Sequence, residues 1–290
     1  MALRLHEDPA LFREAVRFTA AHTDFAERLI EKDYFCSVLL QHLAAAEPAL
    51  VFKGGTCLAK VHAGFYRLSE DLDFVIPVAA DTPRAARRRL AVPLKRAVAA
   101  LPATLAGFQV TQPLTGANSS TQYLAVVTYA SLLRRQADTI KLELGLREPL
   151  LQAAKRLNAG SILLEPVSSQ AMVAPVALRC ITRPEAYAEK FRAALTRREV
   201  AIRDFYDLDY AAQRQGLLPA ERSLVRLVRR KLAVPGNDPP DVSEARLTAL
   251  RRQLDSHLRT VLREADFRAF DLDRAFALVA EMATRIAPRR

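Results

Sequence analysis

The feature that most limits the fold of this chain is a change of pattern near residue 183. Before it, short segments rich in β-branched, aromatic or alternating apolar residues are interleaved with helical segments, whereas after it only helical periodicity is found. Strands interleaved with helices predict an α/β or α+β core. The segments expected to form strands are residues 49–52, 71–77, 108–112, 122–129 and 139–146.

Helical segments are expected on both sides of this change. Residues 9–46 carry apolar side chains at helical spacing, and a basic helix over residues 83–100 is interrupted at Pro93. Thr182 and Glu185 have the spacing of a capping box, which predicts the start of a helix. Further helices are expected over residues 219–232, 247–261 and 271–287, with a Pro- and Gly-containing linker at residues 235–240.

These segments divide the chain into two lobes. We predict an α+β fold in which residues 1–175 form a mixed β-sheet lobe with flanking helices. Residues 176–290 are predicted to form a C-terminal α-helical lobe.

Composition narrows the class of protein. The chain has 290 residues, of which half are hydrophobic, so it is long enough to bury a core without disulfides. Its 43 Lys and Arg against 32 Asp and Glu give a net charge of +11, which favours polyanionic partners. Three scattered cysteines support neither a zinc site nor a disulfide framework. Without a signal-peptide pattern or a membrane-span run, we expect a cytoplasmic protein with no membrane partner.

Asp71 and Asp73 form the first candidate site. In a strand, side chains two residues apart share a face, so both carboxylates project together while Leu72 points to the core. Two such carboxylates repel unless a cation lies between them, and Mg²⁺ prefers oxygen ligands of this kind. Taken alone, two solvated acids on a strand face are the commoner outcome.

A glycine turn follows the preceding strand. Gly54 and Gly55 end that strand, Thr56 is placed to cap a following helix, and backbone N–H groups there would face a phosphate. The segment is neither a P-loop nor a dinucleotide-binding fingerprint, because both glycine spacings are absent. A Gly-Gly pair by itself is more often a plain turn.

Glu143 supplies a third acid. Ile140, Leu142 and Leu144 alternate with Lys141 and Glu143, so the two charged residues share the other face of the strand. If this strand pairs beside residues 71–77, three carboxylates converge and could hold two metal ions for an in-line displacement. An isolated strand of this type would more often be a half-exposed edge.

Two helical segments add charged residues. Lys190 lies in the helix that begins near residue 183, and Asp204 and Asp207 share one helix face because they are three residues apart. Such groups are commonly a solvated lysine and a surface ion pair with a neighbour such as Arg203.

Together these segments resemble the AbiEii/MenT group of nucleotidyltransferase toxins, within the DNA polymerase β-type nucleotidyltransferase superfamily. The resemblance covers roughly residues 30–210. It is carried by Lys53-Gly54-Gly55-Thr56, Arg67-x-Ser69-x-Asp71-Leu72-Asp73, Leu142-Glu143-Leu144, Glu189-Lys190-x-x-Ala193 and Arg203-Asp204-x-x-Asp207-Leu208, with Glu31-Lys32-Asp33-Tyr34 upstream. The chain departs from the wider superfamily at Gly55, where Ser is frequent, and at Glu143, where the third acid is Glu instead of Asp.

The resemblance implies a nucleotidyltransferase-type fold and Mg²⁺-dependent nucleotidyl transfer from an NTP to an acceptor hydroxyl, with release of pyrophosphate. It implies that Lys190 and Asp204 are brought to the cleft by the helical lobe, Asp204 positioning Lys190 or the acceptor. The implied metal ligands are Asp71, Asp73 and Glu143, which with Lys190 and Asp204 form the catalytic set. The implied nucleotide-binding residues are Gly54, Gly55, Thr56, Lys60, Arg67, Ser69 and Lys190.

The resemblance further implies a toxin of a toxin–antitoxin pair that modifies the 3′ end of tRNA and blocks translation, with a cognate antitoxin as partner. Two arginine-rich segments would hold an RNA backbone, although solvated arginine faces are equally common. Two alternatives stay open: transfer to a protein or small-molecule hydroxyl, and an inactive nucleic-acid-binding protein. The residues of the two segments are Arg84, Arg87, Arg88, Arg89, Lys95 and Arg96, and Arg246, Arg251, Arg252, Arg259 and Arg263.

Overall fold

A computed structural model describes residues 4–287 of the chain, which separate into two compact units. Unit 1 comprises residues up to Leu150 together with Ala154–Ile181, and unit 2 comprises Leu151–Ala153 and the residues from Thr182 onward. The boundary expected at residue 175 lies six residues earlier than this division, because residues 176–180 form a strand of the sheet of unit 1. None of the helices within residues 4–287 has the length and apolar character needed to cross a membrane.

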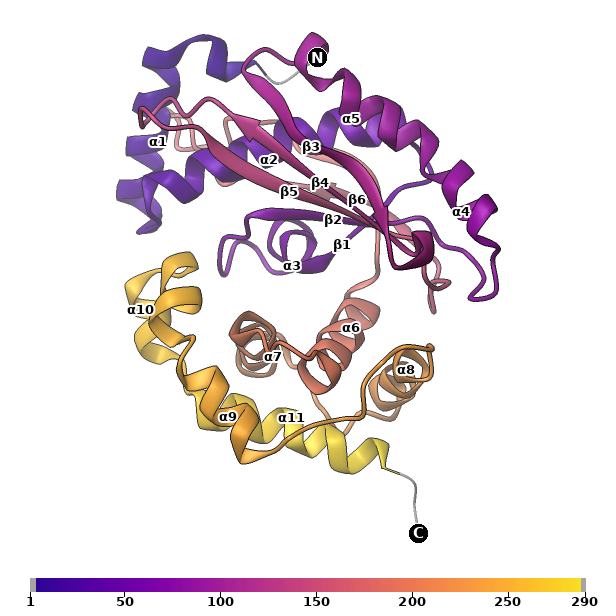
Figure 1. Cartoon of the computed structure of the whole chain (residues 1–290). Helices are drawn as coiled ribbons and strands as arrows, with labels where there is room; N and C mark the ends of the chain where they lie inside the picture. Colours follow the sequence, from indigo (N-terminus) through magenta and orange to yellow (C-terminus); the bar gives the residue numbers. More distant parts are fainter. Residues whose placement is uncertain (1–3, 288–290) are drawn as a thin grey trace. The chain divides into compact units, whose positions relative to one another are not determined.

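Unit 1 is built on a mixed sheet, which within the described residues has seven strands in the order β3-β4-β5-β2-β1-β7-β6 (Figure 1). β2 pairs with β5 and β1 with β7 in parallel, and the other neighbouring pairs are antiparallel. This confirms the expected mixed sheet. The strands are β1 (Val51–Lys53), β2 (Asp71–Val75), β3 (Phe108–Ala117), β4 (Gln122–Tyr129), β5 (Asp138–Gly145), β6 (Lys155–Ala159) and β7 (Val176–Cys180).

The helices of unit 1 cover the sheet on both sides. Figure 1 shows α1 (Pro9–Thr23), α2 (Glu27–Ala46) and α5 (Val92–Thr104) on one side of the strands and α3 (Gly54–Cys57) on the other. The helix expected over residues 9–46 is divided in two, because Asp24 adopts a left-handed conformation with φ 58°. Pro93 begins α5 and does not interrupt a longer helix, since proline is tolerated in the first turn; α4 (Arg84–Leu90) precedes it.

α2 is the central helix of unit 1. Every residue from Leu29 to Leu40 is buried, so its sequence shows little amphipathic pattern. The buried stretch includes three consecutive charged side chains, Glu31, Lys32 and Asp33, which must therefore find partners inside the protein.

The regular secondary structure of the described residues of unit 2 is helical, as expected, with loops between the helices. Thr182 precedes the first helix, but its hydroxyl donates to Gln152 and makes no cap, while Glu185 accepts from the backbone N–H groups of Leu151 and Gln152. The expected capping box is therefore wrong, because both side chains bind the segment that enters the unit. The helices are α6 (Arg183–Thr196), α7 (Ile202–Gln215), α8 (Arg222–Leu232), α9 (Glu244–Arg251), α10 (Glu264–Ala269) and α11 (Leu272–Ile286).

Candidate active site

The three acids predicted from the sequence lie on two neighbouring strands. β2 and β5 run parallel, and Asp73 is the register partner of Glu143 while Asp71 is the partner of Lys141. Residues directly opposite each other in paired strands project to the same face, and Asp71 and Asp73 share a face by alternation. Leu72 and Leu142 between them are buried in the core. The backbone therefore brings Asp71, Asp73 and Glu143 to one face of the sheet, where all three side chains are half-buried.

The glycine turn packs directly against this face. Gly54 has φ +75°, and a Cβ added to it would overlap the carboxylate of Asp73. A Cβ on Gly55 would lie 2.5 Å from Nη2 of Arg67 and 3.2 Å from Oγ of Ser69. Glycine is required at Gly54, where a positive φ and the overlap with Asp73 act together, whereas a side chain at Gly55 would displace the end of Arg67. The structure thus brings Gly54, Gly55, Arg67, Ser69 and Asp73 together.

Thr56 has a different role from the one expected. Its hydroxyl donates a hydrogen bond to the backbone carbonyl of Asp71, and its side chain is buried. The helix that it was expected to cap begins at Gly54, with no side-chain cap. Thr56 therefore joins the glycine turn to β2, and its hydroxyl is turned to the strand instead of a phosphate.

Lys60 does not lie where the sequence placed it. Its ammonium is buried, forms an ion pair with Oδ1 of Asp33 at 2.6 Å, and donates to Oγ of Ser37 at 2.8 Å and to the carbonyl of Gly160 at 3.2 Å. The structure therefore does not bring the ammonium of Lys60 to the glycine turn, where the expected nucleotide contact would place it. Lys60 lies in the π-helical turn Leu58–His62, and its buried partners Asp33 and Ser37 belong to α2.

Arg67 and Ser69 border the glycine turn on its second side. The guanidinium of Arg67 is buried, donates through Nη1 to the carbonyl of Leu68 at 3.2 Å and lies over the ring of Tyr66. Ser69 is half-buried. A buried cation beside a side-chain-free turn is an arrangement suited to an anionic group of a ligand.

Asp71, Asp73 and Glu143 suit a Mg²⁺ ion that is also bound by the phosphates of a nucleotide. Within residues 4–287, no three or more His, Cys, Asp or Glu side chains lie close enough together to hold a metal ion. The register of β2 and β5 brings Asp71, Asp73 and Glu143 to one face of the sheet, and the side chains form no such metal-holding group there. Mg²⁺ is commonly held by one or two carboxylates together with substrate phosphates and water. The donor set fits an ion that arrives with a nucleotide, not a cage made by the protein alone.

Unit 2 holds the remaining predicted residues in a cluster of its own. Nζ of Lys190 on α6 lies 2.6 Å from Oδ1 of Asp204 and 2.8 Å from Oδ2 of Asp207, both on α7. Arg197 approaches the other oxygen of Asp204 at 3.1 Å. Burial alone would raise the pKa of Asp204, but Lys190 and Arg197 outweigh burial and hold this pKa below its usual value. Asp204 is therefore a buried anion bound to Lys190, instead of the partner of Arg203 on a surface.

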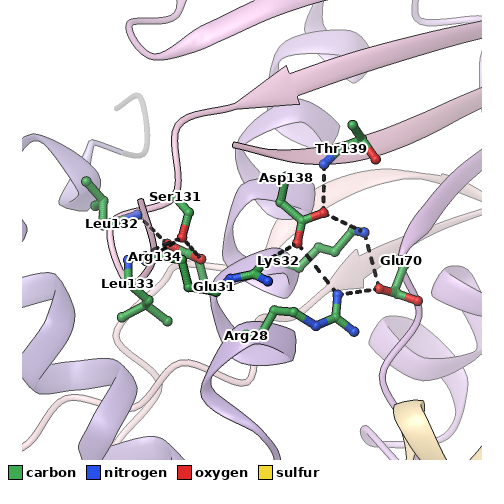
Figure 2. Close-up of polar contacts among 10 residues, drawn as sticks. All are labelled: Arg28, Glu31, Lys32, Glu70, Ser131, Leu132, Leu133, Arg134, Asp138 and Thr139. Atoms are coloured by element: carbon green, nitrogen blue, oxygen red, sulfur yellow. Dashed lines mark hydrogen bonds and ion pairs between the residues drawn. The ribbon is translucent and has the colours of Figure 1, made fainter. Parts of the chain in front are cut away.

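A further charged group beside the site was not expected from the sequence. Arg28 and Lys32 of α2 contact Glu70, the residue before Asp71, and Asp138, the first residue of β5 (Figure 2). The sequence signals near it are the Glu31-Lys32-Asp33 run and the motif around Ser69 and Asp71, but neither predicts that Lys32 pairs with Glu70 and Asp138.

The two basic segments differ in how their charge is matched. Arg246 is buried and donates to the carbonyls of Ala194 and Arg197, which makes it a packing residue. Arg251, Arg259 and Arg263 each form an ion pair with an acid of unit 2. In the part of the chain that is described, no carboxylate partner is found for the exposed residues Arg84, Arg88, Arg89 and Arg96 of α4 and α5.

Comparison with known proteins shows the family of the chain. Residues 38–281 match the protein-family model described as nucleotidyl transferase AbiEii toxin, type IV TA system. Among solved structures, the fold is similar to MenT4, a nucleotidyltransferase toxin from Mycobacterium tuberculosis, with 20% identity, TM-score 0.56 and coverage of 93% of this chain and 89% of that one. It is also similar to JHP933 from Helicobacter pylori, with 17% identity, TM-score 0.52 and coverage of 90% and 93%. A comparison with curated proteins finds no significant match.

Proposed function

Because the chain belongs to the AbiEii nucleotidyltransferase toxin family of type IV toxin–antitoxin systems, and is therefore a nucleotidyltransferase, we propose that it transfers a nucleoside monophosphate from an NTP to an RNA hydroxyl with release of pyrophosphate. The acceptor favoured by the resemblance is the 3′ end of a tRNA, whose modification blocks translation. The observation that supports this most is the register of β2 and β5, which sets Asp73 opposite Glu143 beside the glycine turn.

In this proposal Asp71, Asp73 and Glu143 hold Mg²⁺ together with the triphosphate. The ion would neutralise charge that develops on the phosphates and on the leaving pyrophosphate. The carboxylate of Glu143 accepts the proton of the acceptor hydroxyl as that oxygen attacks the α-phosphorus. Attack forms the new P–O bond and breaks the bond to pyrophosphate.

The remaining residues bind and orient the nucleotide. The turn at Gly54 and Gly55 leaves room for a phosphate to approach the backbone, and Arg67 and Ser69 donate hydrogen bonds to its oxygens. From unit 2, the proposal assigns Lys190 to the triphosphate and Asp204 to holding its ammonium. Thr56 and Lys60 are left out of the nucleotide contacts because both are bound elsewhere in unit 1.

An RNA acceptor is favoured by the unmatched arginines of α4 and α5, since phosphate contacts from Arg and Lys supply most non-specific nucleic-acid affinity. The family assignment also implies a cognate antitoxin as a partner.

The test is a transfer assay with each labelled NTP, Mg²⁺ and total RNA, with Asp71→Asn and Asp73→Asn variants as controls. We expect label in the tRNA fraction with the wild-type chain and none above background with either variant, both variants remaining folded by circular dichroism. Label in protein or in an added small-molecule hydroxyl would move the acceptor to another class. No transfer by the wild-type chain to any acceptor, together with salt-sensitive RNA binding, would replace the proposal by an inactive nucleic-acid-binding protein.

A further inference from the structure

Three consecutive side chains of α2 each bind a different segment that adjoins part of the candidate site in the chain. The helix is buried on all sides at this point, so side chains that point in different directions all meet protein. These side chains are Glu31, Lys32 and Asp33, which we call the α2 charge triplet.

Glu31 fixes the loop that leads into β5. Its Oε2 accepts from the hydroxyl of Ser131 at 2.7 Å and its Oε1 accepts from the backbone N–H of Leu132 at 2.7 Å (Figure 2). The carboxylate is fully buried, and burial raises its pKa while these hydrogen bonds oppose the rise. A buried carboxylate with both oxygens bonded to one loop holds that loop in a single conformation.

Lys32 joins the starts of the two strands that carry the acids. Its ammonium lies 3.2 Å from Oε1 of Glu70 and 3.4 Å from Oδ1 of Asp138. Arg28, one helical turn earlier, contacts the same two carboxylates at 2.7 Å and 3.6 Å. Figure 2 shows the two cations between the two acids. Glu70 is the residue before Asp71, and Asp138 opens the strand of Glu143.

This contact acts from the opposite side of the sheet. Asp138 and Glu143 are five residues apart on one strand, so their side chains point to opposite faces. Lys32 therefore lies on the α2 side and does not touch the face that bears the candidate metal ligands. Its contacts with Glu70 and Asp138 lie at the starts of β2 and β5, the strands that carry Asp73 and Glu143.

Asp33 holds the segment that follows the glycine turn. Its Oδ1 pairs with Nζ of Lys60 at 2.6 Å, and its Oδ2 accepts from Oγ of Ser161 at 2.9 Å and the N–H of Ile162 at 3.1 Å. Lys60 lies in the π-helical turn directly after α3, which begins at Gly54. The third member of the triplet thus anchors the helix that carries Gly54 and Gly55.

We propose that the α2 charge triplet positions the active site, with Lys32 as the positioning residue that sets the spacing between the strands of Asp71, Asp73 and Glu143. The inference rests on the proposed nucleotidyl transfer for its kinetic readout. None of the three side chains is needed in contact with substrate. The effect on the reaction arises because a displacement of about 1 Å in catalytic groups can cost about 10²-fold in rate.

The experiment compares Lys32→Gln, which removes the charge, with Lys32→Arg, which keeps it. Lys231→Gln is the matched control, because Lys231 is also buried between two carboxylates, Glu185 at 2.8 Å and Glu189 at 3.0 Å, within unit 2. For each variant, hydrogen exchange of backbone amides, melting temperature, kcat and the KM for NTP are measured.

For Lys32→Gln we expect faster exchange in segments 70–75 and 138–145 but not in 176–180, a kcat about 10- to 100-fold lower, and a KM for NTP within about threefold of wild type. Lys32→Arg should restore most of kcat. Lys231→Gln should leave exchange in segments 70–75 and 138–145 unchanged, even at a comparable loss of melting temperature. Glu70→Gln, which keeps Lys32 paired with Asp138, provides a milder test if Lys32→Gln does not fold.

An unchanged kcat in both Lys32→Gln and Glu70→Gln would overturn the proposal. It would also be overturned if kcat and melting temperature fell together in Lys32→Gln in the same proportion as in Lys231→Gln. Exchange that rises uniformly over the sheet would also overturn it. If the wild-type chain transfers no nucleotide, the proposed function fails instead, and the exchange pattern alone decides whether Lys32 sets the two strands.

Discussion

The two units treat their acidic side chains in opposite ways. In unit 1, Asp71, Asp73 and Glu143 lie half-buried on the face of a sheet beside a turn without side chains. In unit 2, Asp204 and Asp207 are 3% and 1% exposed, and both bind Lys190. A buried acid matched by a lysine has its charge satisfied by the protein, whereas acids on a half-open face can accept a cation that comes with a ligand. Burial and a lysine partner thus separate the acids of unit 2 from the half-buried acids of unit 1.

The largest expected effects come from one substitution in each unit. Asp73→Asn should lower nucleotide transfer by at least about 10²-fold, because it removes a ligand for the charge that develops in the reaction. Asp207→Asn should lower the free energy of unfolding by about 3 kcal/mol, because it leaves part of a buried ion-pair cluster unmatched. Transfer assays and urea unfolding on both variants would measure the contrast.

The control for Asp73→Asn is unfolding, which it should leave nearly unchanged. For Asp207→Asn, transfer is measured at a temperature where the variant is folded, and it should fall less than in Asp73→Asn because Lys190 keeps Asp204 as a partner. Equal proportional losses of activity and stability in both variants would remove the distinction between the units.

Gly54 in unit 1 and Gly216 in unit 2 allow a second comparison of the two units, with smaller expected changes in the free energy of unfolding. Gly54 and Gly216 have positive φ of 75° and 68°, but an added Cβ overlaps Asp73 at Gly54 and meets nothing within 4 Å at Gly216. Gly216→Ala should lower the free energy of unfolding by about 1 kcal/mol from backbone strain alone. Gly54→Ala should cost about 2–3 kcal/mol and abolish transfer, since strain and overlap act together. Similar unfolding free energies for the two variants would contradict the close packing inferred at the turn.

The buried acids of unit 2 predict a dependence on pH. Because the pKa of Asp204 is lowered in the folded state, its contribution is fully present above the unfolded pKa of about 3.8 and is lost as pH falls through the folded value. Stability of unit 2 should therefore decrease below about pH 4, and Asp204→Asn should flatten that decrease. Thermal unfolding between about pH 2.5 and 6, followed by a probe placed in unit 2, measures it. An identical pH profile for wild type and variant would refute the assignment.

The smallest effect concerns the arginines. Arg88→Gln with Arg89→Gln should weaken RNA binding and reduce the slope of log affinity against log salt by about one for each phosphate that is no longer bound. Arg251→Gln with Arg259→Gln is the matched control of equal charge, because both side chains already pair with acids. Filter binding at several salt concentrations would measure both, and equal slopes for the two double variants would show that the matched arginines bind RNA as well as the unmatched ones.

Alternation and spacing were sufficient to predict much of unit 1. The strands over residues 122–129 and 139–146 are found within one residue of their expected bounds, because β-branched residues and strict alternation are typical of half-buried strands. β6 and β7 were missed. β6 is an exposed edge strand with charged residues, and β7 has only five residues, so neither provides a long enough pattern.

The sequence was sufficient to predict those positions in the candidate site that depend only on the course of the backbone. Alternation put Asp71 and Asp73 on one face, and a correct strand pairing then brought Glu143 beside them. Thr56 and Lys60 could not be placed in this way. Their directions depend on a hydrogen bond to Asp71 and on a buried ion pair with Asp33, partners that are 15 and 27 residues away in the sequence.

The parallel pairing of β2 with β5 joins positions that are far apart in the chain. Asp73 and Glu143 are 70 residues apart in sequence, and parallel pairing over such a separation forms slowly because a long loop must close first. A nascent chain that has not yet released β5 from the ribosome carries the aspartates and the glycine turn without their third carboxylate. The proposed site, with all three carboxylates, can thus assemble only after β5 has been synthesised, and a chain truncated before β5 is expected to transfer no nucleotide.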